Sequence, residues 1–174
     1  HGYWPIFATV VDKRFGTDQE LHEMLATAHA HNMNVVLDYV ANHMHINSPT
    51  LQQNPDWHTD SILPDGRRNF ELWDEARLTT WFDVHIPTLD LERAEVCGPM
   101  TDSALFWLEN FTFDGFRHDA CKHIPLNYWR ELGRKMKQRY PNRHIWMIGE
   151  TYGNTDLIGS YVKTGMLNSQ FDFN

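Results

Sequence analysis

Cysteine, basic runs and long apolar stretches are scarce or missing in this sequence, and each absence narrows what the chain can be. The 174 residues include only two cysteines, Cys97 and Cys121. Two are too few for a disulfide framework, so a single disulfide and the redox compartment stay open, and Cys121 is expected to be a small buried filler. No apolar run approaches the roughly 20 residues of a membrane-spanning helix. A net charge of −8 without a basic cluster argues against nucleic acid and anionic membranes as partners.

Apolar and aromatic residues, by contrast, are plentiful. Hydrophobic residues make up 41% of the chain and aromatic residues 13%, enough for the core of one globular domain. The aromatic excess suits sugar binding as well as core packing, and four tryptophans are candidates for either role: Trp4, Trp57, Trp73 and Trp81. No signal peptide is visible, but the chain opens in the middle of a motif, so the compartment stays open, as does the oligomeric state.

Helical and strand periodicities alternate along the chain, which predicts an α/β fold with a parallel sheet. Thr17 and Glu20 have the spacing of a capping box, and residues 1–16 before them are expected to form the tail of a strand and a loop. The predicted elements are helices over 17–31, 100–112 and 126–140, strands over 35–40, 113–118 and 145–149, a loop or short helix over 151–167, and the start of another strand over 170–174.

Residues 45–89 interrupt this alternation. The segment is rich in Asn, Asp, Pro and Thr, and it is too long for an ordinary connection. We expect an inserted, loop-rich subdomain there, flanked by the two parts of the main fold, residues 1–44 and 90–174.

Three apolar segments end in ionisable or polar side chains. These are Asp38, Asn42 and His43 in the first segment, Arg117, His118, Asp119, Lys122 and His123 in the second, and Glu150 in the third. A single cluster of this kind could be a structural salt bridge at the end of a strand, with no catalytic role. Three strands that each deliver a carboxylate at the same end favour a single site, because catalytic residues of α/β barrels lie at those strand ends.

Asp119 and Glu150 are about one strand–helix repeat apart, so neighbouring parallel strands would place them across a narrow gap. Glycosidic bond cleavage needs such a pair, with carboxyl groups about 5–5.5 Å apart in the retaining mechanism and about 6.5–9.5 Å apart in the inverting one. Arg117 should point to the same side of its strand as Asp119 and keep that carboxylate ionised, as a nucleophile must be. The apolar residues before Glu150 suit a protonated general acid.

Histidines support a competing hypothesis, in which His43, His118 and His123 join nearby carboxylates in a metal-dependent hydrolase. No His-x-His pair is present, and Arg117 and Lys122 would bring positive charge close to a cation, so this hypothesis is the weaker one. Core packing within a strand explains His118 equally well.

Four segments closely resemble successive motifs of the α-amylase family of glycoside hydrolases (family 13): His1–Trp4, Asp38–His43, Gly115–His123 and Ile148–Glu150. They keep the family's order and approximate spacing over nearly the whole chain. The resemblance implies a (β/α)8 TIM barrel, which typically needs about 250 residues. The chain would then be a partial barrel, from about the end of strand 2 to the start of strand 6, with an inserted subdomain after strand 3.

The resemblance also implies roles for particular residues. Asp119 matches the catalytic nucleophile, Glu150 the general acid/base, and Arg117 the arginine that supports the nucleophile. The other matches are His43 and Tyr3 in sugar subsite −1, Lys122 and His123 in the acceptor subsites, and Asp38 as a structural aspartate. The family's third catalytic carboxylate has no match in these residues, so the chain alone is expected to be inactive or poorly folded.

A structural calcium ion is implied as well, and no organic cofactor. Asn42, Asp90 and the backbone carbonyl of His123 match the family's usual calcium site, whose oxygen ligands suit this ion. Thr88 departs from the pattern, because many relatives carry an acidic residue there. The departure would alter specificity without changing the chemistry.

The expected function is a retaining glycosidase that cleaves α-glucosidic bonds in starch-like glucans or maltooligosaccharides by double displacement. The same apparatus serves transglycosylation, so a 4-α-glucanotransferase is the close alternative. A non-catalytic carbohydrate-binding homologue is a third possibility, against which the presence of both Asp119 and Glu150 weighs. Linkage, chain-length preference and endo or exo action are not set by these residues.

Overall fold

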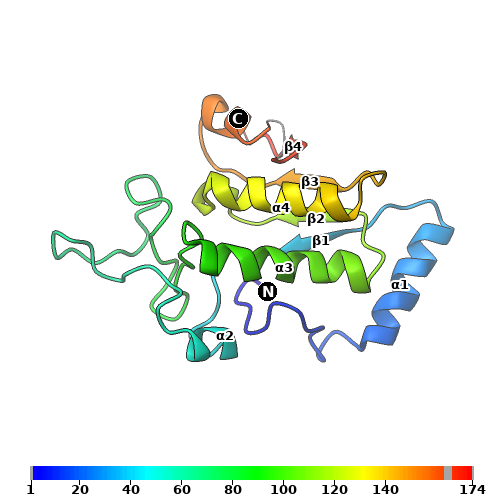
Figure 1. Ribbon diagram of the computed structural model, residues 1–174, viewed down its shortest axis with the longest axis horizontal. Coiled ribbons are helices and arrows are strands. Elements are labelled where there is room, and N and C mark those ends of the chain that lie inside the picture. The colour runs from blue at the N-terminus through cyan, green and yellow to red at the C-terminus, as the bar shows by residue number, and fades with distance from the viewer. Residues whose placement is uncertain (1, 163–165, 174) are drawn as a thin grey trace.

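The computed structural model describes residues 2–162 and 166–173 and contains a parallel four-stranded sheet whose strands follow one another in chain order (Figure 1). The strands are β1 (Val36–Tyr39), β2 (Gly115–His118), β3 (Trp146–Gly149) and β4 (Ser169–Gln170). The helices are α1 (Asp18–Ala30), α2 (Pro49–Gln53), α3 (Ala94–Asn110), α4 (Leu126–Arg139) and α5 (Thr155–Ser160), with a 3-10 turn η1 (Cys121–His123). Strands in chain order are typical of a (β/α) barrel, whereas a doubly wound sheet reverses its order.

Residues of each strand alternate between the two faces of the sheet. Phe116 and His118 are fully buried, and the ring of His118 packs against Trp129 of α4 at 4.9 Å between centroids. Arg117, between them, therefore faces the other side, as predicted. The register pairs Asp38 with Arg117 across β1 and β2, so both side chains lie on the same face.

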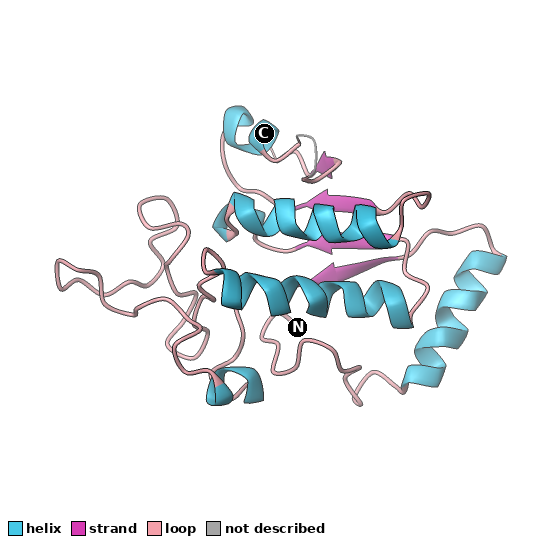
Figure 2. Ribbon diagram, viewed as in Figure 1, coloured by secondary structure: helices cyan, strands magenta, loops and turns pink. Residues whose placement is uncertain are grey.

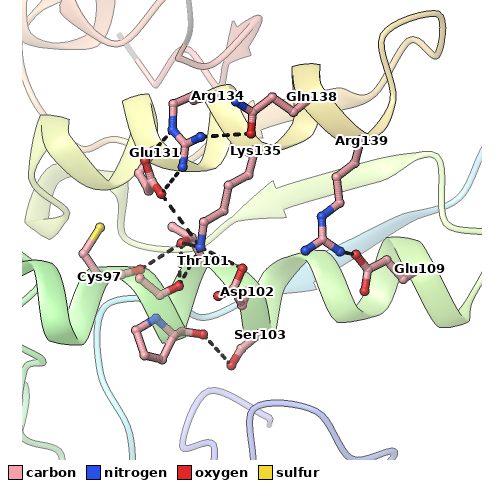
Figure 3. Close-up of polar contacts among 12 residues, drawn as sticks. Cys97, Thr101, Asp102, Ser103, Glu109, Glu131, Arg134, Lys135, Gln138 and Arg139 are labelled. Atoms are coloured by element: carbon pink, nitrogen blue, oxygen red, sulfur yellow. Dashed lines mark hydrogen bonds and ion pairs between the residues drawn. The ribbon is translucent and has the colours of Figure 1, made fainter.

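Helices α3 and α4 lie side by side over one face of the sheet (Figure 2). Lys135 of α4 reaches across to α3, where its ammonium donates to the Gly98 carbonyl at 2.9 Å, Thr101 Oγ1 at 2.8 Å and Asp102 Oδ1 at 2.7 Å (Figure 3). These contacts join the helices beside Pro99, which interrupts the hydrogen bonding within α3. The apolar layer beneath is formed by Leu105, Leu108, Tyr128, Trp129, Leu132 and Phe116.

Most predicted elements are present with small shifts. Thr17 caps α1 with the predicted capping box, in which the Glu20 carboxylate accepts from the Thr17 N–H at 2.8 Å. Helix α3 begins at Ala94, earlier than the predicted 100, because Gly98 and Pro99 look like a helix boundary and yet lie inside the helix. Helix α5 is the short helix predicted within 151–167.

Two predictions at the chain ends differ from the structure. Residues 2–16 form no strand, although the tail of a strand was predicted there; His1 lies outside the described residues. The segment is a loop whose Pro5 carbonyl accepts a hydrogen bond from the His45 N–H at 2.8 Å. The predicted strand over 170–174 is the two-residue β4, and residues 163–165 and 174 lie outside the described part. No helix in that part is long and apolar enough to cross a membrane.

Residues 45–89 contain only the short helix α2 and isolated bridges. The segment projects from the edge of the sheet at which the strands finish (Figure 1). An antiparallel bridge between His43 and Thr88 closes its base, next to a hydrogen bond from the Leu89 N–H to the Asn42 carbonyl at 2.9 Å. The segment therefore lies beside the strand ends that carry the candidate site.

Candidate active site

Arg117 is the centre of a group of charged side chains at the carboxyl ends of β1, β2 and β3. Its guanidinium contacts Asp38 Oδ1 at 2.7 Å, Asp119 Oδ1 at 2.8 Å and Glu150 Oε1 at 2.7 Å. The Asp119 and Glu150 side chains are 12% and 18% exposed, whereas that of Asp38 is 47% exposed. The three carboxylates that the sequence predicted to meet at one edge thus surround a single cation.

The backbone beyond β2 and β3 fixes Asp119 and Glu150 side by side. Their N–H groups each donate to a carbonyl of the preceding strand at 3.0 Å, so the ladder continues past the strand ends. Neighbouring strands lie about 4.8 Å apart, which puts the two side chains on one face and within reach of each other. Ala120 then turns the chain with φ 50°, a left-handed conformation that non-glycine residues seldom adopt and that is common near active sites.

Burial decides the charge state of Asp119. Burial raises the pKa of Asp119 to about 6, and the hydrogen bond and positive charge of Arg117 offset this effect only in part. The net shift of the Asp119 pKa is upward, although the effect of Arg117 is to lower it. Asp119 is still mainly ionised at neutral pH, because its pKa remains below 7.

Tyr3 and His43 lie next to the Asp38 side of this group. Tyr3 Oη donates to Asp38 Oδ2 at 2.8 Å, and its ring centroid is 5.8 Å from the Arg117 guanidinium carbon. His43 Nε2 donates to the Tyr3 carbonyl at 2.9 Å, since a carbonyl can only accept. Burial lowers the pKa of His43 to about 4, so the ring is neutral. Their contact with a sugar stays a prediction.

Lys122 and His123 lie in η1, directly after Asp119, and both side chains are buried. The Lys122 ammonium forms an ion pair with Asp74 of the 45–89 segment. His123 Nδ1 donates to the Arg77 carbonyl of the same segment at 2.7 Å. The two residues predicted for the acceptor subsites are therefore held by the segment that projects over the strand ends.

Among the predicted calcium ligands, Asn42 has a side-chain oxygen that would suit a cation. Asn42 Oδ1 is buried without a hydrogen-bond partner, as a metal ligand would be, but Asn42 Nδ2 contacts the neutral Thr88 Oγ1 and His43 Nδ1, each at 3.3 Å. Among the described residues Asn42 has no polar side-chain contact with Asp90, which lines a cavity of the 45–89 segment. Asparagine and backbone carbonyl oxygens, like carboxylates, are ligands that suit calcium, so calcium binding by Asn42, Asp90 and the His123 carbonyl stays a prediction.

Thr88 is buried and serves the fold at the base of the 45–89 segment. Its hydroxyl donates to the Thr80 carbonyl at 2.6 Å and accepts from Asn42 Nδ2 at 3.3 Å. An acidic residue here could not donate to Thr80, so the departure from the family pattern is accommodated by a different hydrogen bond.

The histidines of the metal hypothesis have separate environments. His118 faces away from the carboxylates, and its Nε2 lies 3.4 Å from Met147 Sδ, which agrees with core packing. No group of three or more His, Cys, Asp or Glu side chains in the described residues could hold a metal ion. Both cysteines are free, and the fully buried Cys121 thiol donates to the His118 carbonyl at 3.2 Å, as expected for a filler.

Several residues at the site were missed by sequence reasoning. Asp74 and Arg77 belong to a segment without periodicity, and nothing in their neighbourhood marks them. Phe171, whose ring centroid lies 5.9 Å from the Arg117 guanidinium carbon, follows the very short β4. Of the four tryptophans, Trp81 is buried and Trp57 is partly buried against the core, whereas Trp4 and Trp73 are 51% and 36% exposed and stay candidates for sugar contact.

A parallel sheet in chain order, with the carboxylates of Asp119 and Glu150 at its carboxyl edge, places the chain in the class of α/β-barrel proteins whose sites lie at the strand ends. The family description "Alpha amylase, catalytic domain" matches residues 1–174. The chain therefore belongs to the α-amylase family.

Individual relatives agree with this assignment. The α-amylase of Streptomyces lividans is 26% identical over 99% of the chain and 25% of its own length, and the maltogenic α-amylase of Bacillus acidopullulyticus is 28% identical over 87% of the chain and 26% of its length. The crystal structure of Geobacillus thermoleovorans α-amylase with acarbose has a TM-score of 0.84 and 30% identity over 99% of the chain and 38% of the solved one. The chain thus spans about a quarter of the length of these curated relatives.

Proposed function

We propose that this chain carries the nucleophile and the general acid/base of a retaining glycosidase that cleaves α-glucosidic bonds. One observation carries the proposal: a single guanidinium, Arg117, holds Asp119 and Glu150 from adjacent strands at 2.8 and 2.7 Å. Side-by-side carboxylates match the short separation that retention requires better than the wide gap that inversion needs.

In the first step, an Asp119 oxygen attacks the anomeric carbon while Glu150 gives its proton to the departing glycosidic oxygen. The products are a glycosyl ester on Asp119 and a free sugar hydroxyl. In the second step, Glu150 takes a proton from water, and the water oxygen attacks the anomeric carbon and releases Asp119. Two inversions restore the starting configuration.

Arg117 orients both carboxylates. Its ion pair with Asp119 supports the charge that attack requires, and its contact with Glu150 holds that side chain beside the nucleophile. Glu150 must hold a proton to act as the general acid in the first step. The exposed Asp38 remains as a partner for Arg117 throughout the cycle.

The similarity to solved α-amylases also supports a finer placement of the fold. In this proposal β1 to β4 are strands 3 to 6 of a (β/α)8 barrel, and residues 45–89 are the subdomain inserted after strand 3. The sheet edge next to that segment is then the catalytic face of the barrel.

Starch-like glucans or maltooligosaccharides are the proposed substrates. The Geobacillus relative was solved with acarbose, and the other relatives named above are amylases. A 4-α-glucanotransferase remains the alternative, because a sugar hydroxyl can replace water in the second step. The buried Lys122 and His123 beside Asp119 would take part in the choice of acceptor.

A substrate with fluoride as leaving group tests both roles. Fluoride departs without protonation, so Glu150→Gln should still form the glycosyl ester from α-maltosyl fluoride, and the ester should accumulate because the general base is missing. Mass spectrometry of peptides should find the sugar on Asp119. Hydrolysis of maltooligosaccharides should fall by about 10²–10⁴-fold, and Glu131→Gln, on the surface of α4, serves as the matched control.

Proton NMR of the wild-type reaction gives the second criterion. The first sugar released should be the α-anomer. An initial β-anomer, or an adduct on a residue other than Asp119, would overturn the mechanism. Absence of cleavage of every α-glucan by the wild type would replace the proposal with the carbohydrate-binding alternative.

A further inference from the structure

Residues 45–89, called the projecting segment below, contact the turn η1 on several sides through their residues 72–77. The side chains that make this contact take no part in the two catalytic steps. We propose that Arg77 is a positioning residue, which locks Lys122 and His123 to the projecting segment and so sets the acceptor side of the site. The inference rests on the proposed glycosidase function and extends it to the choice of acceptor.

Arg77 joins three parts of the chain. Its Nη1 donates to the Lys122 carbonyl at 2.6 Å and to Tyr161 Oη at 3.1 Å, and its own carbonyl accepts from His123 Nδ1 at 2.7 Å. Tyr161, at the end of α5, is buried and also lies 3.4 Å from the Lys122 carbonyl. Arg77 thus holds two consecutive residues of η1, one through its side chain and the other through its backbone.

The contact with Arg77 determines the tautomer of His123. A carbonyl can only accept a hydrogen bond, so Nδ1 carries the proton. In the neutral ring, Nε2 is then the acceptor. A neutral acceptor at this place suits a sugar hydroxyl, which can donate to it.

Asp74 holds the side chain of Lys122 in place. The Asp74 carboxylate, itself 90% exposed, pairs with the Lys122 ammonium, whose side chain is only 11% exposed. An ammonium has three N–H donors, so the pair leaves donors for a ligand. The projecting segment therefore sets the position of both polar groups of η1, the ammonium through Asp74 and the imidazole through Arg77.

Aromatic packing supports the same arrangement. The His123 ring lies 5.0 Å from Phe82 and 5.6 Å from Trp73, between centroids, and both aromatic residues belong to the projecting segment. Trp73 is adjacent to Asp74. A shift of residues 72–77 would therefore move the surroundings of Lys122 and His123 without moving the carboxylates of Asp119 and Glu150.

Arg77→Met tests the proposal, because methionine keeps much of the side-chain volume and removes the side-chain hydrogen bonds to the Lys122 carbonyl and Tyr161 Oη. The main-chain carbonyl that accepts from His123 Nδ1 is kept, but it loses the anchor that the guanidinium provides. Arg67→Met is the matched control: Arg67 belongs to the same segment, and its ion pairs are with Asp65 and Glu75 of that segment. In the full-length protein, transfer from α-maltosyl fluoride to maltose should show a KM for maltose about tenfold higher in Arg77→Met, the effect of losing hydrogen bonds to the turn. Formation of the glycosyl ester should change less than about threefold.

Nitrogen-15 NMR of histidine gives a readout that needs no activity. In the wild type and in Arg67→Met, His123 should show a protonated Nδ1 and an unprotonated Nε2 at neutral pH. In Arg77→Met the tautomer should become mixed, because the Arg77 carbonyl is no longer held in place by the side-chain hydrogen bonds. An unchanged tautomer together with an unchanged KM for maltose would overturn the positioning role.

The two proposals fail in different ways. If the wild type transfers no sugar, the proposed function is wrong, and the NMR result alone decides whether Arg77 positions His123. If Arg77→Met does not fold, Arg77→Lys replaces it. Lysine keeps a cationic donor group but lacks the planar guanidinium that reaches both the Lys122 carbonyl and Tyr161, so the same changes are expected at smaller size.

Discussion

One carboxylate lies at each end of strand β2, and the pKa values of the two are shifted in opposite directions. Asp114, before the strand, accepts from the Val35 N–H at 2.7 Å and contacts His29 Nε2 at 2.9 Å. Burial alone would raise the pKa of Asp114, but these hydrogen bonds lower it below its usual value. Asp119, after the strand, has a pKa raised to about 6, because burial outweighs the effect of Arg117.

The difference lies in how many groups share each donor. At the amino end, Asp114 receives its own hydrogen bonds, and its backbone carbonyl also accepts from the Trp146 N–H at 2.9 Å, so it joins β1, β2 and β3. At the carboxyl end, Arg117 alone serves Asp38, Asp119 and Glu150. A fold built for stability alone has no need to crowd three carboxylates around one cation, whereas a reactive site does.

Asp119→Asn should give the largest effect and separate activity from stability. Loss of the nucleophile should lower kcat by about four to six orders of magnitude. Between pH 3.8, the usual pKa of an aspartate, and pH 6, the approximate pKa of Asp119 in the folded protein, the folded state keeps the Asp119 proton and the unfolded state loses it. The free energy of unfolding therefore falls as pH rises through this range. Asn cannot ionise, and at pH 7 the variant should be more stable by about 1–3 kcal/mol.

Glucan hydrolysis and thermal unfolding at pH 5 and pH 7 measure both parts of this prediction. The gain in stability should be larger at pH 7, where the wild-type carboxyl is mainly ionised. A variant that is inactive and also less stable at pH 7 would show that Asp119 is a structural ion pair, and the contrast between the two strand ends would disappear.

Arg117→Lys should have the next largest effect. Lysine retains the charge but lacks the planar fork that contacts three carboxylates, so kcat/KM should fall by about 10²-fold. In the wild type, kcat/KM should decrease below the Asp119 pKa of about 6, because only the ionised form attacks. The weaker cation should move this acidic limb to higher pH by roughly one unit. An unchanged limb would mean that Arg117 does not control the charge of Asp119.

Sequence reasoning predicted the carboxyl end of the sheet better than the amino end. Asp119 and Glu150 are recognisable because ionisable residues directly follow apolar runs. Asp114 lies inside a segment predicted as strand, and its partner His29 is 85 positions away, so no local pattern reveals the contact. Similarly, the sequence shows that Arg117 is near Asp119 but does not show how deeply both are buried, so the raised pKa of Asp119 could not be predicted from it.

The other errors have the same origin in contacts distant along the chain. Helix α3 begins before Gly98 and Pro99 because packing against α4, including the Lys135 ammonium, outweighs two unfavourable local residues. Arg77 belongs to no periodic sequence pattern, and its partners lie far along the chain, in η1 and at Tyr161. Sequence reasoning therefore had no signal for it.

Asp114→Asn should have the smallest effect and the opposite one to Asp119→Asn. Asn keeps an acceptor for the Val35 N–H but loses the charge that strengthens both hydrogen bonds. The free energy of unfolding should therefore be lower by about 1–2 kcal/mol at pH 7. Because hydrogen bonds lower the folded pKa of Asp114, the wild type loses this stability as pH falls through that pKa, and the two proteins should converge in acid. Thermal unfolding from pH 7 to pH 3 measures the convergence.

Activity provides the control for this variant. The kcat should stay within about twofold, since Asp114 is at the edge of the sheet opposite to Arg117. A large fall in kcat of the fully folded variant would mean that the two ends of β2 are not independent.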